Sequence, residues 1–299
     1  MIIPKKIKIG DKIGIVATAR KISMDELNPA ILILESWGFK VVLGRFILNE
    51  ENQFSGSVNQ RLYDFQNMID DNEIKAILCA RGGYGTVQII DKINFSGLYK
   101  RPKWIIGYSD ITVLHAHLNQ LGLATLHATM PINFSRNTNS ALDSLRDILL
   151  GKDSCIKIPS NEQNRIGIVE AEIVGGNISV LYSLLGSKSD VRTDDRILFW
   201  EDLDEYLYHI DRMVINMKRN GKLNNLKGMI VGGLIDMNDN QVAFGKTAEE
   251  IVLEHVKEYN FPICFGFPSG HLEDNRSIIL GVKSVLEVKE NSVNLLQSF

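Results

Sequence analysis

The sequence predicts an α/β protein of two domains: a first domain built on a mainly parallel sheet flanked by helices, and a second, smaller α/β domain. Short apolar runs alternate with amphipathic stretches along the first half of the chain, which is typical of right-handed βαβ units. The length of 299 residues exceeds that of a usual single domain. With 44% hydrophobic and 23% charged residues, the chain has the composition of a globular protein that buries a sizeable core.

Predicted strands and helices follow one another at regular spacing through the first half of the chain. The helices are predicted from apolar residues that recur on one helical face, as Leu27, Ile31 and Leu34 do. The predicted strands cover residues 13–17, 40–43, 74–80, 104–108 and 123–127, and the predicted helices cover residues 27–37, 62–69, 86–93 and 111–121. Ligands of parallel sheets bind beyond the carboxyl ends of the strands. We therefore expect a site in the loops that follow these ends.

The second half of the chain is more mixed, and the regular alternation ends near residue 137. We expect a linker at residues 156–171, between an N-terminal domain of residues 1–155 and a C-terminal domain of residues 172–299. One helix of the C-terminal domain begins at a Thr247–Glu250 capping box. The predicted elements are a helix entered at residues 175–177, a strand at 196–200, helices at 206–219 and 247–259, a strand at 262–267 and a terminal hairpin within 284–296.

The charge of the chain argues against a polyanionic partner. There are 33 Lys and Arg against 36 Asp and Glu, a formal net charge of −3, so no basic excess points to nucleic acid or to an anionic membrane. A small ligand fits better. No export signal or membrane span is evident, and Cys79 and Cys264 lie in apolar runs, as buried free thiols do. We expect a cytoplasmic protein with neither a disulfide framework nor a metal site.

Ser109 stands where a predicted strand turns directly into a predicted helix. A serine on such an elbow is exposed at the carboxyl edge of the sheet, and the unpaired N–H groups of the next helix favour a developing negative charge. Ser109 is therefore a candidate nucleophile. A serine at this place also commonly caps the helix, and the elbow alone leaves both interpretations open.

A serine nucleophile needs a base, and His271 is the best placed of the six histidines. It follows a predicted strand in a loop without a packing pattern, where catalytic groups collect. An imidazole base needs a carboxylate to orient it, and Glu201 and Asp202 end an apolar strand. A solvated strand end is the alternative for this acidic pair. His127 ends a predicted strand beside the elbow and is a weaker candidate. The histidines predicted to pack or to face solvent are His115, His117, His209 and His255.

A glycine-rich loop of sequence RGGYG, residues 81–85, follows the third predicted strand. Its glycines let the backbone approach a ligand and aim N–H groups inward. The third glycine of a dinucleotide motif is missing, with Gln88 in its place, and there is no Walker lysine-serine pair, so phosphate binding is disfavoured. Because adjacent parallel strands would bring this loop beside Ser109, we expect an oxyanion donor here. A plain glycine turn is the alternative.

Five separated motifs are more specific together than any one of them. They are Ala80-Arg81-Gly82-Gly83-Tyr84-Gly85, Gly107-Tyr108-Ser109-Asp110, Gly175-Gly176-Asn177, Trp200-Glu201-Asp202 and Gly270-His271. Their order and spacing resemble those of the LD-carboxypeptidases, the serine peptidase family that also contains the microcin C self-immunity proteins. The resemblance spans nearly the whole chain.

This resemblance implies a Ser-Glu-His triad in which Ser109 is the nucleophile, His271 the general base and Glu201 the group that orients the imidazole. It implies an oxyanion hole made by the backbone N–H groups of Asp110 and Gly83. The N-terminal domain would resemble class I glutamine amidotransferases, and the C-terminal domain would supply the acid and the base. Members of the family are usually homodimers and use no metal or other cofactor.

The implied reaction is hydrolysis of the bond between an L-configured centre and the terminal D-alanine of murein tetrapeptides, a step of cell-wall recycling. Arg81 is the cation that we expect to bind the terminal carboxylate. Gly82, Tyr84 and Trp200 are further candidates for substrate contacts, although Trp200 stands where the family pattern predicts a smaller aliphatic residue.

Two alternatives remain open at this stage. A related hydrolase of peptide-nucleotide antibiotic conjugates would need an aromatic side chain to stack on the nucleobase, and Trp200 is the only hint of one. The other alternative is a non-catalytic protein of two lobes that binds a small ligand, for which the order of the triad residues would be coincidence.

Overall fold

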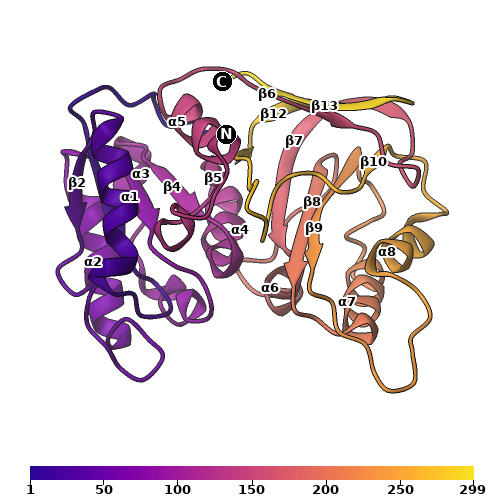
Figure 1. Ribbon diagram of the computed structural model, residues 1–299, viewed down its shortest axis with the longest axis horizontal. Helices are drawn as coiled ribbons and strands as arrows, with labels where there is room; N and C mark the ends of the chain where they lie inside the picture. Colours follow the sequence, from indigo (N-terminus) through magenta and orange to yellow (C-terminus); the bar gives the residue numbers. More distant parts are fainter.

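The first lobe of the protein is built on a six-stranded sheet that is parallel except at one edge. The computed structural model describes all 299 residues, and Figure 1 shows two lobes that each contain one sheet. The strand order is β11-β5-β4-β3-β1-β2. The strands are β1 (Lys12–Val16), β2 (Lys40–Leu43), β3 (Ile74–Cys79), β4 (Trp104–Gly107), β5 (Thr125–His127) and β11 (Ile278–Leu280). The predicted mainly parallel sheet is confirmed, whereas its likeness to class I glutamine amidotransferases stays a prediction.

Helices cover both faces of this sheet, because alternate strand residues are buried on opposite sides. Ile77 and Cys79 of β3 pack in one apolar cluster with residues of α2, α3 and α4, and Ala76 and Leu78 pack in another with residues of α1 and α5. Both α1 and α2 begin at serine capping boxes. The helices are α1 (Met24–Ser36), α2 (Val58–Asp70), α3 (Ser96–Lys100), α4 (Thr112–Gln120) and α5 (Asn139–Leu149).

Residues 86–93 do not form the helix that the sequence predicts. They contain two 3₁₀ turns, η1 (Thr86–Gln88) and η2 (Ile90–Lys92). Most residues of the segment are β-branched, which lowers helix propensity. The buried Arg61 also fixes its start, because its guanidinium donates to the carbonyl of Gly85 at 3.0 Å and to Oε1 of Gln88 at 2.6 Å.

The second lobe is built on a seven-stranded sheet of order β10-β9-β8-β7-β12-β13-β6. One half of it is parallel and the other half is antiparallel. The strands are β6 (Ser154–Pro159), β7 (Gly167–Asn177), β8 (Ile197–Leu203), β9 (Gly228–Ile235), β10 (Ile263–Cys264), β12 (Lys283–Val288) and β13 (Ser292–Gln297), and the helices are α6 (Ile178–Ser183), α7 (Leu207–Arg219) and α8 (Ala248–Val256). The predicted terminal hairpin, the long helix α7 and the capping box of α8 are confirmed.

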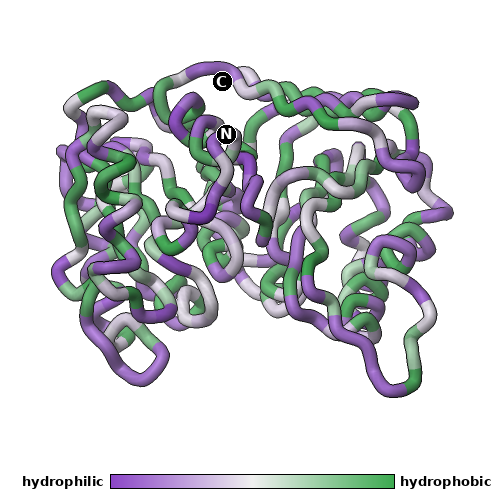
Figure 2. The backbone as a smooth tube through the Cα atoms, viewed as in Figure 1, coloured by the Kyte–Doolittle hydropathy of each residue, from purple (hydrophilic) through white to green (hydrophobic).

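The segment 156–171, predicted as a linker, contains most of β6 and the start of β7. The strand β6 was missed because its partner β13 lies more than a hundred residues later and its polar residues alternate on an open edge. The sequence analysis also did not predict β7, β9 and β11, and it overestimated the length of β10. Figure 2 shows that the hydrophobic segments run mainly through the inner strands and helices, with hydrophilic residues along the outer loops. The domain limits themselves stay a prediction.

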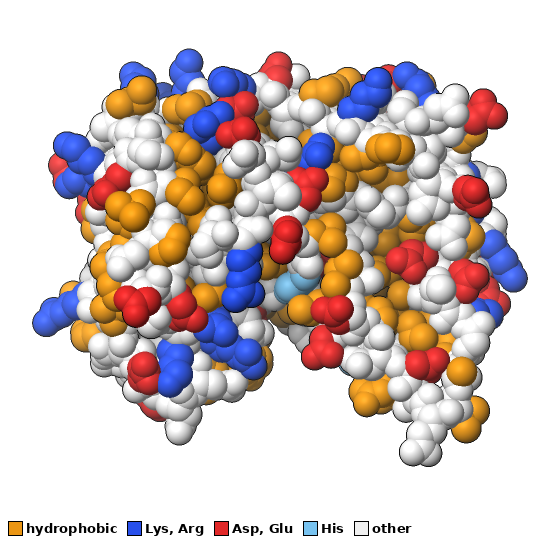
Figure 3. Space-filling view, in the orientation of Figure 1, with side chains coloured by type: hydrophobic (Ala, Val, Ile, Leu, Met, Phe, Trp, Pro, Cys, Tyr) orange, Lys and Arg blue, Asp and Glu red, His pale blue; other side chains and the backbone are white.

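The two lobes meet along α4, which lies between the sheets (Figure 1). Gly176 lies so close to Thr112 that a Cβ atom there would be 2.5 Å from the threonine Oγ1, and the N–H of Asn177 donates to the same oxygen at 3.0 Å. On one side of this contact the lobes part, and Figure 3 shows a hollow with a histidine side chain inside it and Lys or Arg side chains on its border. No helix has the length and apolar character needed to cross a membrane.

Candidate active site

Ser109 occupies a strained turn at the carboxyl end of β4. Its φ angle is 62°, in the left-handed region that side chains other than glycine rarely adopt, and such a conformation costs on the order of 1 kcal/mol. Glycine is needed two residues earlier, at Gly107, because a Cβ atom there would lie 2.8 Å from the Ile111 side chain. The Ser109 side chain caps neither the short 3₁₀ helix η3 (Ser109–Ile111) nor α4. The N-cap interpretation of Ser109 is therefore wrong.

The glycine loop lies directly beside this serine, because β3 and β4 are parallel neighbours. A Cβ atom on Gly82 would lie 3.0 Å from Cβ and 3.1 Å from Oγ of Ser109, so no larger residue fits without movement. Asp110 ties the two loops together: its Oδ2 accepts the N–H of Thr86 at 2.9 Å. Gly83 adopts a φ angle of 106°, which aims the loop backbone in a way that only glycine allows without strain.

The second lobe contributes a histidine and a buried carboxylate that are joined directly. Nδ1 of His271 lies 2.6 Å from Oε2 of Glu201, at the end of β8. Gly270 is required beside this pair, since it has a φ angle of 112° and a Cβ atom there would lie 2.7 Å from Cβ of Glu201. The other oxygen of Glu201, Oε1, is buried and has no hydrogen-bond partner. The Glu-Asp pair is thus buried and not a solvated strand end.

These contacts shift the pKa values of the second lobe's groups. Burial acts to lower the pKa of His271, but the charge and hydrogen bond of Glu201 and the charge of Asp202 outweigh it, and the pKa is raised above the usual 6.5. Burial and the neighbouring Glu201 raise the pKa of Asp202 to about 7. Asp202 accepts hydrogen bonds from the Asn177 side chain at 2.8 Å and from the N–H of Ser179 at 2.9 Å. It therefore fixes the strand end that carries Glu201.

Ser109 and His271 open into one cavity of about 370 Å³ between the lobes. Tyr108 forms part of its wall, with its ring centroid 4.8 Å from that of His271 and its hydroxyl accepting a hydrogen bond from Asn133 at 2.6 Å. The remaining lining residues are Arg20, Glu26, Arg81, Gly82, Gly83, Met130, Ile132, Arg136 and Leu203. Of these, only Arg81, Gly82 and Gly83 were predicted from the sequence, and the unpredicted residues include two arginines, Arg20 and Arg136.

Two predicted substrate contacts lie elsewhere. Trp200 is only 1% exposed and packs in the core, because it alternates with Glu201 along β8 and faces the opposite side of the sheet. The prediction of Trp200 as a pocket residue is therefore wrong. Tyr84 is 49% exposed, has its ring 6.2 Å from that of Phe54 and does not line the cavity.

The other histidines do not face the cavity. His115 is fully buried, with Nε2 2.9 Å from the carbonyl of Gly107, and Nδ1 of His117 is 2.9 Å from Oγ of Ser189. His127 is also fully buried and lies behind Tyr108, with ring centroids 5.9 Å apart. The prediction that His115 and His117 pack within the protein is confirmed, and His127 packs as well.

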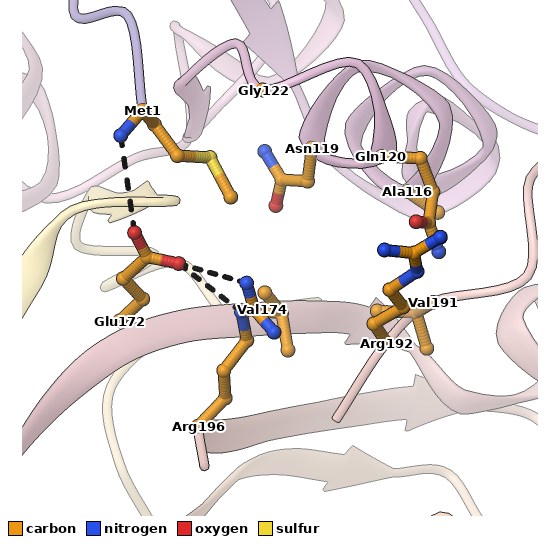
Figure 4. A pocket seen from close by; sticks show the side chains of 10 residues that line it. All are labelled: Met1, Ala116, Asn119, Gln120, Gly122, Glu172, Val174, Val191, Arg192 and Arg196. Atoms are coloured by element: carbon orange, nitrogen blue, oxygen red, sulfur yellow. Dashed lines mark hydrogen bonds and ion pairs between the residues drawn. The ribbon is translucent and has the colours of Figure 1, made fainter. Parts of the chain in front are cut away.

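A second pocket, of about 240 Å³, lies at the opposite end of α4 (Figure 4). Its acidic side chain, Glu172, lies between the amino group of Met1 at 3.9 Å and the guanidinium of Arg196 at 3.1 Å. No serine, cysteine or histidine lines it. This pocket therefore lacks the serine and histidine side chains that line the cavity between the lobes.

Fold and cavity together define a two-lobed α/β protein with serine, histidine and carboxylate groups at its cleft, an arrangement typical of hydrolases that use a serine nucleophile. Comparison with known proteins narrows this class. The LD-carboxypeptidase N-terminal domain matches residues 13–128, and the LD-carboxypeptidase C-terminal domain matches residues 170–286. The chain belongs to the LD-carboxypeptidase family.

Individual relatives agree with this assignment. The chain is 32% identical to a probable murein peptide carboxypeptidase of Bacillus subtilis, over 97% of this chain and 92% of that one. It is 23% identical to the microcin C7 self-immunity protein of Escherichia coli, over 97% and 94% of the two chains. The muramoyltetrapeptide carboxypeptidase of Oxalobacter formigenes has the same fold, with a TM-score of 0.89 at 23% identity over 96% of this chain and 99% of that one.

Proposed function

We propose that the protein is a serine-type LD-carboxypeptidase that releases the terminal D-alanine from murein tetrapeptides by the triad Ser109, Glu201 and His271. The observation that carries the proposal is the convergence on one cavity of a strained serine and a histidine bonded to a buried glutamate. The similarity to the probable murein peptide carboxypeptidase of Bacillus subtilis supports murein peptides as the substrate class.

In the proposed reaction, Oγ of Ser109 attacks the carbonyl carbon of the L-configured residue while Nε2 of His271 takes its proton. The backbone N–H groups of Asp110 and Gly83 donate to the oxyanion. The C–N bond then breaks, and the imidazolium returns its proton to the nitrogen of the leaving D-alanine. Water, deprotonated by His271, attacks the acyl-enzyme and frees the tripeptide and Ser109.

The electrostatics of the second lobe suit this cycle. The buried Oε1 of Glu201 has no partner, so the carboxylate is stabilised mainly by the imidazole beside it. A positive charge on His271 compensates the buried negative charge, and this favours the proton transfer from Ser109. Glu201 also holds Nδ1 as the protonated nitrogen, which leaves Nε2 free to act as the base.

The remaining expectations are proposals of the same kind. Cytoplasmic location and a homodimer follow from the sequence and the family resemblance. For the antibiotic-conjugate alternative, the burial of Trp200 removes the one aromatic group that favoured nucleobase stacking in the pocket. Hydrolysis of murein tetrapeptides is therefore the better supported function.

The test is mass spectrometry of a murein tetrapeptide incubated with the wild-type protein and with Ser109→Ala, in the presence of a chelator. We expect the wild type to remove one alanine residue and Ser109→Ala to lower kcat/KM by about 10³-fold or more. Equal cleavage by both proteins would contradict the role of Ser109. Absence of cleavage by a folded wild type would contradict the substrate.

A further inference from the structure

Three arginines and one glutamate line the cavity between the lobes, although the chain as a whole has a net charge of −3. The arginines are Arg20, Arg81 and Arg136. A local excess of positive charge at a cleft selects an anionic ligand group. Arg81 has an ion pair and a side-chain hydrogen bond within the protein, whereas Arg20 and Arg136 have neither. Arg20 is distinguished from Arg136 by its place over the glycine loop, against Gly83.

Arg81, the cation that the sequence favoured, already has partners within the protein. Its Nη1 lies 3.6 Å from Oε1 of Glu26 and donates to the carbonyl of Lys21 at 3.2 Å. Glu26 in turn accepts the N–H of Ser23 at 2.8 Å in the capping box of α1. Arg81 therefore joins the glycine loop to the start of α1, and its charge is compensated there.

Arg20 lies over the glycine loop with its charge uncompensated. Its Cδ, Cγ and Nε atoms lie 2.6, 2.7 and 2.9 Å from the position that a Cβ atom on Gly83 would take. Its own N–H donates to the carbonyl of Gly82 at 3.4 Å. No carboxylate lies within 4.0 Å of its guanidinium, and the side chain donates no hydrogen bond within the protein. The glycine loop thus contacts Ser109 through Gly82 and Arg20 through Gly83.

We propose that Arg20 binds the terminal carboxylate of the substrate and so determines the specificity for a chain end; this inference rests on the proposed carboxypeptidase function. In a carboxypeptidase substrate, the terminal carboxylate carbon lies three bonds from the scissile carbonyl carbon, within about 4 Å. The terminal carboxylate of the substrate must therefore bind next to the oxyanion site. Arg20 occupies that position, because it covers Gly83, the proposed oxyanion donor.

The guanidinium group suits this role better than an ammonium group would. It is planar and forms two parallel hydrogen bonds with a carboxylate, which fixes the orientation of the terminal residue as well as its charge. The glycine at position 83 is then needed twice: its N–H faces the oxyanion, and the missing side chain leaves room for Arg20.

The experiment compares a murein tetrapeptide that ends in D-alanine with the same peptide ending in D-alaninamide. The proteins are the wild type, Arg20→Met, which keeps an apolar side chain over Gly83, and Arg20→Lys, which keeps the charge alone. Arg81→Ala and Arg136→Ala serve as matched controls from the same cavity. Circular dichroism and Tm establish that each variant is folded.

We expect the wild type to prefer the acid over the amide by about 10- to 100-fold in kcat/KM, the effect of one charge-assisted contact. Arg20→Met should lose this preference through slower cleavage of the acid, with the amide nearly unaffected, and Arg20→Lys should lie between. Arg81→Ala and Arg136→Ala should keep the wild-type ratio of kcat/KM for the acid to kcat/KM for the amide, whatever their absolute rates.

Three results would overturn the assignment: a wild type that cleaves acid and amide equally well, Arg20→Met slowing both substrates equally, or a control variant losing the preference in place of Arg20→Met. A folded wild type that cleaves neither peptide would instead overturn the proposed function, and with it this role of Arg20. The two peptides thus separate a wrong role for Arg20 from a wrong substrate for the protein.

Discussion

The surroundings of His271 shift the pKa of its imidazole in two opposite directions. Burial disfavours its positive charge, whereas the charge of Glu201, its hydrogen bond to Nδ1 and the charge of Asp202 favour it, and the balance raises the pKa above 6.5. A general base must be neutral to accept a proton. Because its pKa is raised, His271 becomes protonated, and can no longer accept a proton, at a higher pH than an ordinary histidine.

The raised pKa of His271 predicts how the activity depends on pH. We expect kcat/KM of the wild type to fall as pH decreases through a value above 6.5. In Glu201→Gln the charge that raises the pKa of His271 is absent while burial remains, so the acid limb should move to lower pH as the maximum rate falls. The measurement is kcat/KM from pH 5 to 9. An acid limb that stays in place in Glu201→Gln would show that another group sets it.

Ser109, Glu201 and His271 could be singled out as candidates because each one ends or follows a predicted strand, but the triad itself was implied by the family resemblance and stays a prediction. The structure places Ser109 and His271 at one cavity and Glu201 against His271. Arg20 and Trp200 could not be placed from the sequence. The position of Arg20 over Gly83 depends on β1 lying next to β3, and strand order is not evident from a pattern of strands and helices. The prediction for Trp200 was wrong because neighbouring residues of a strand face opposite sides of the sheet, so Trp200 and Glu201 do not share the cavity.

At the scale of elements, the site depends on the attachment of the glycine loop to the start of α4. Asp110 is 4% exposed and accepts the N–H of the fully buried Thr86. Burial raises the pKa of Asp110, and hydrogen bonds from Thr86 and Gly85 oppose that shift. Without the carboxylate, the buried N–H of Thr86 has no partner, and the backbone around Gly83 is less firmly held.

Asp110→Ala should therefore lower the free energy of unfolding by about 1–3 kcal/mol and kcat/KM by about 10- to 100-fold, because the proposed oxyanion donor is less well positioned. Asp110→Asn keeps an oxygen that accepts the same N–H and is the matched control. Urea unfolding and steady-state kinetics check both effects. If Ala and Asn variants behaved alike, the hydrogen bond to Thr86 would not position the loop.

Elements with strong local patterns were predictable, and those defined by distant partners were not. The helix α7 and the hairpin of β12 and β13 follow from periodicity and turn residues. In contrast, β6 is an edge strand that exists because β13 pairs with it, and β11 is three residues long and defined by its pairing with β5. Such pairings depend on contacts between residues far apart in the chain.

Over the whole molecule, the loop that carries His271 is anchored in both lobes. After leaving the second sheet, the chain passes Glu273, whose carbonyl accepts the N–H of Thr138 at 3.1 Å, and Asp274, whose Oδ1 accepts the Thr138 hydroxyl at 2.9 Å. It then enters the first sheet as β11, with Ile278 opposite His127. The loop of His271 is thus held at the cavity that Ser109 also lines by strands and helices of the other lobe.

Because β11 and the hydrogen bonds of Thr138 join the two lobes, we expect the lobes to unfold together. The native cysteines can report this unfolding without any substitution. Cys79 in the first sheet and Cys264 in the second are fully buried, and burial raises the pKa of each thiol to about 12, so neither reacts in the native state. Cys155 is exposed and serves as the control that reacts at once.

Pulsed alkylation across a urea series, read by peptide mass spectrometry, should give the same midpoint for Cys79 and Cys264. The physical reason is that separation of the lobes removes β11 from the first sheet and breaks the contacts of Thr112 with Gly176 and Asn177, so neither lobe keeps its native edges alone. Labelling of Cys264 at a distinctly lower urea concentration than Cys79 would mean that the second lobe unfolds independently. In that case the position of His271 would depend on the second lobe alone, and the anchoring through Thr138 and β11 would not contribute to the site.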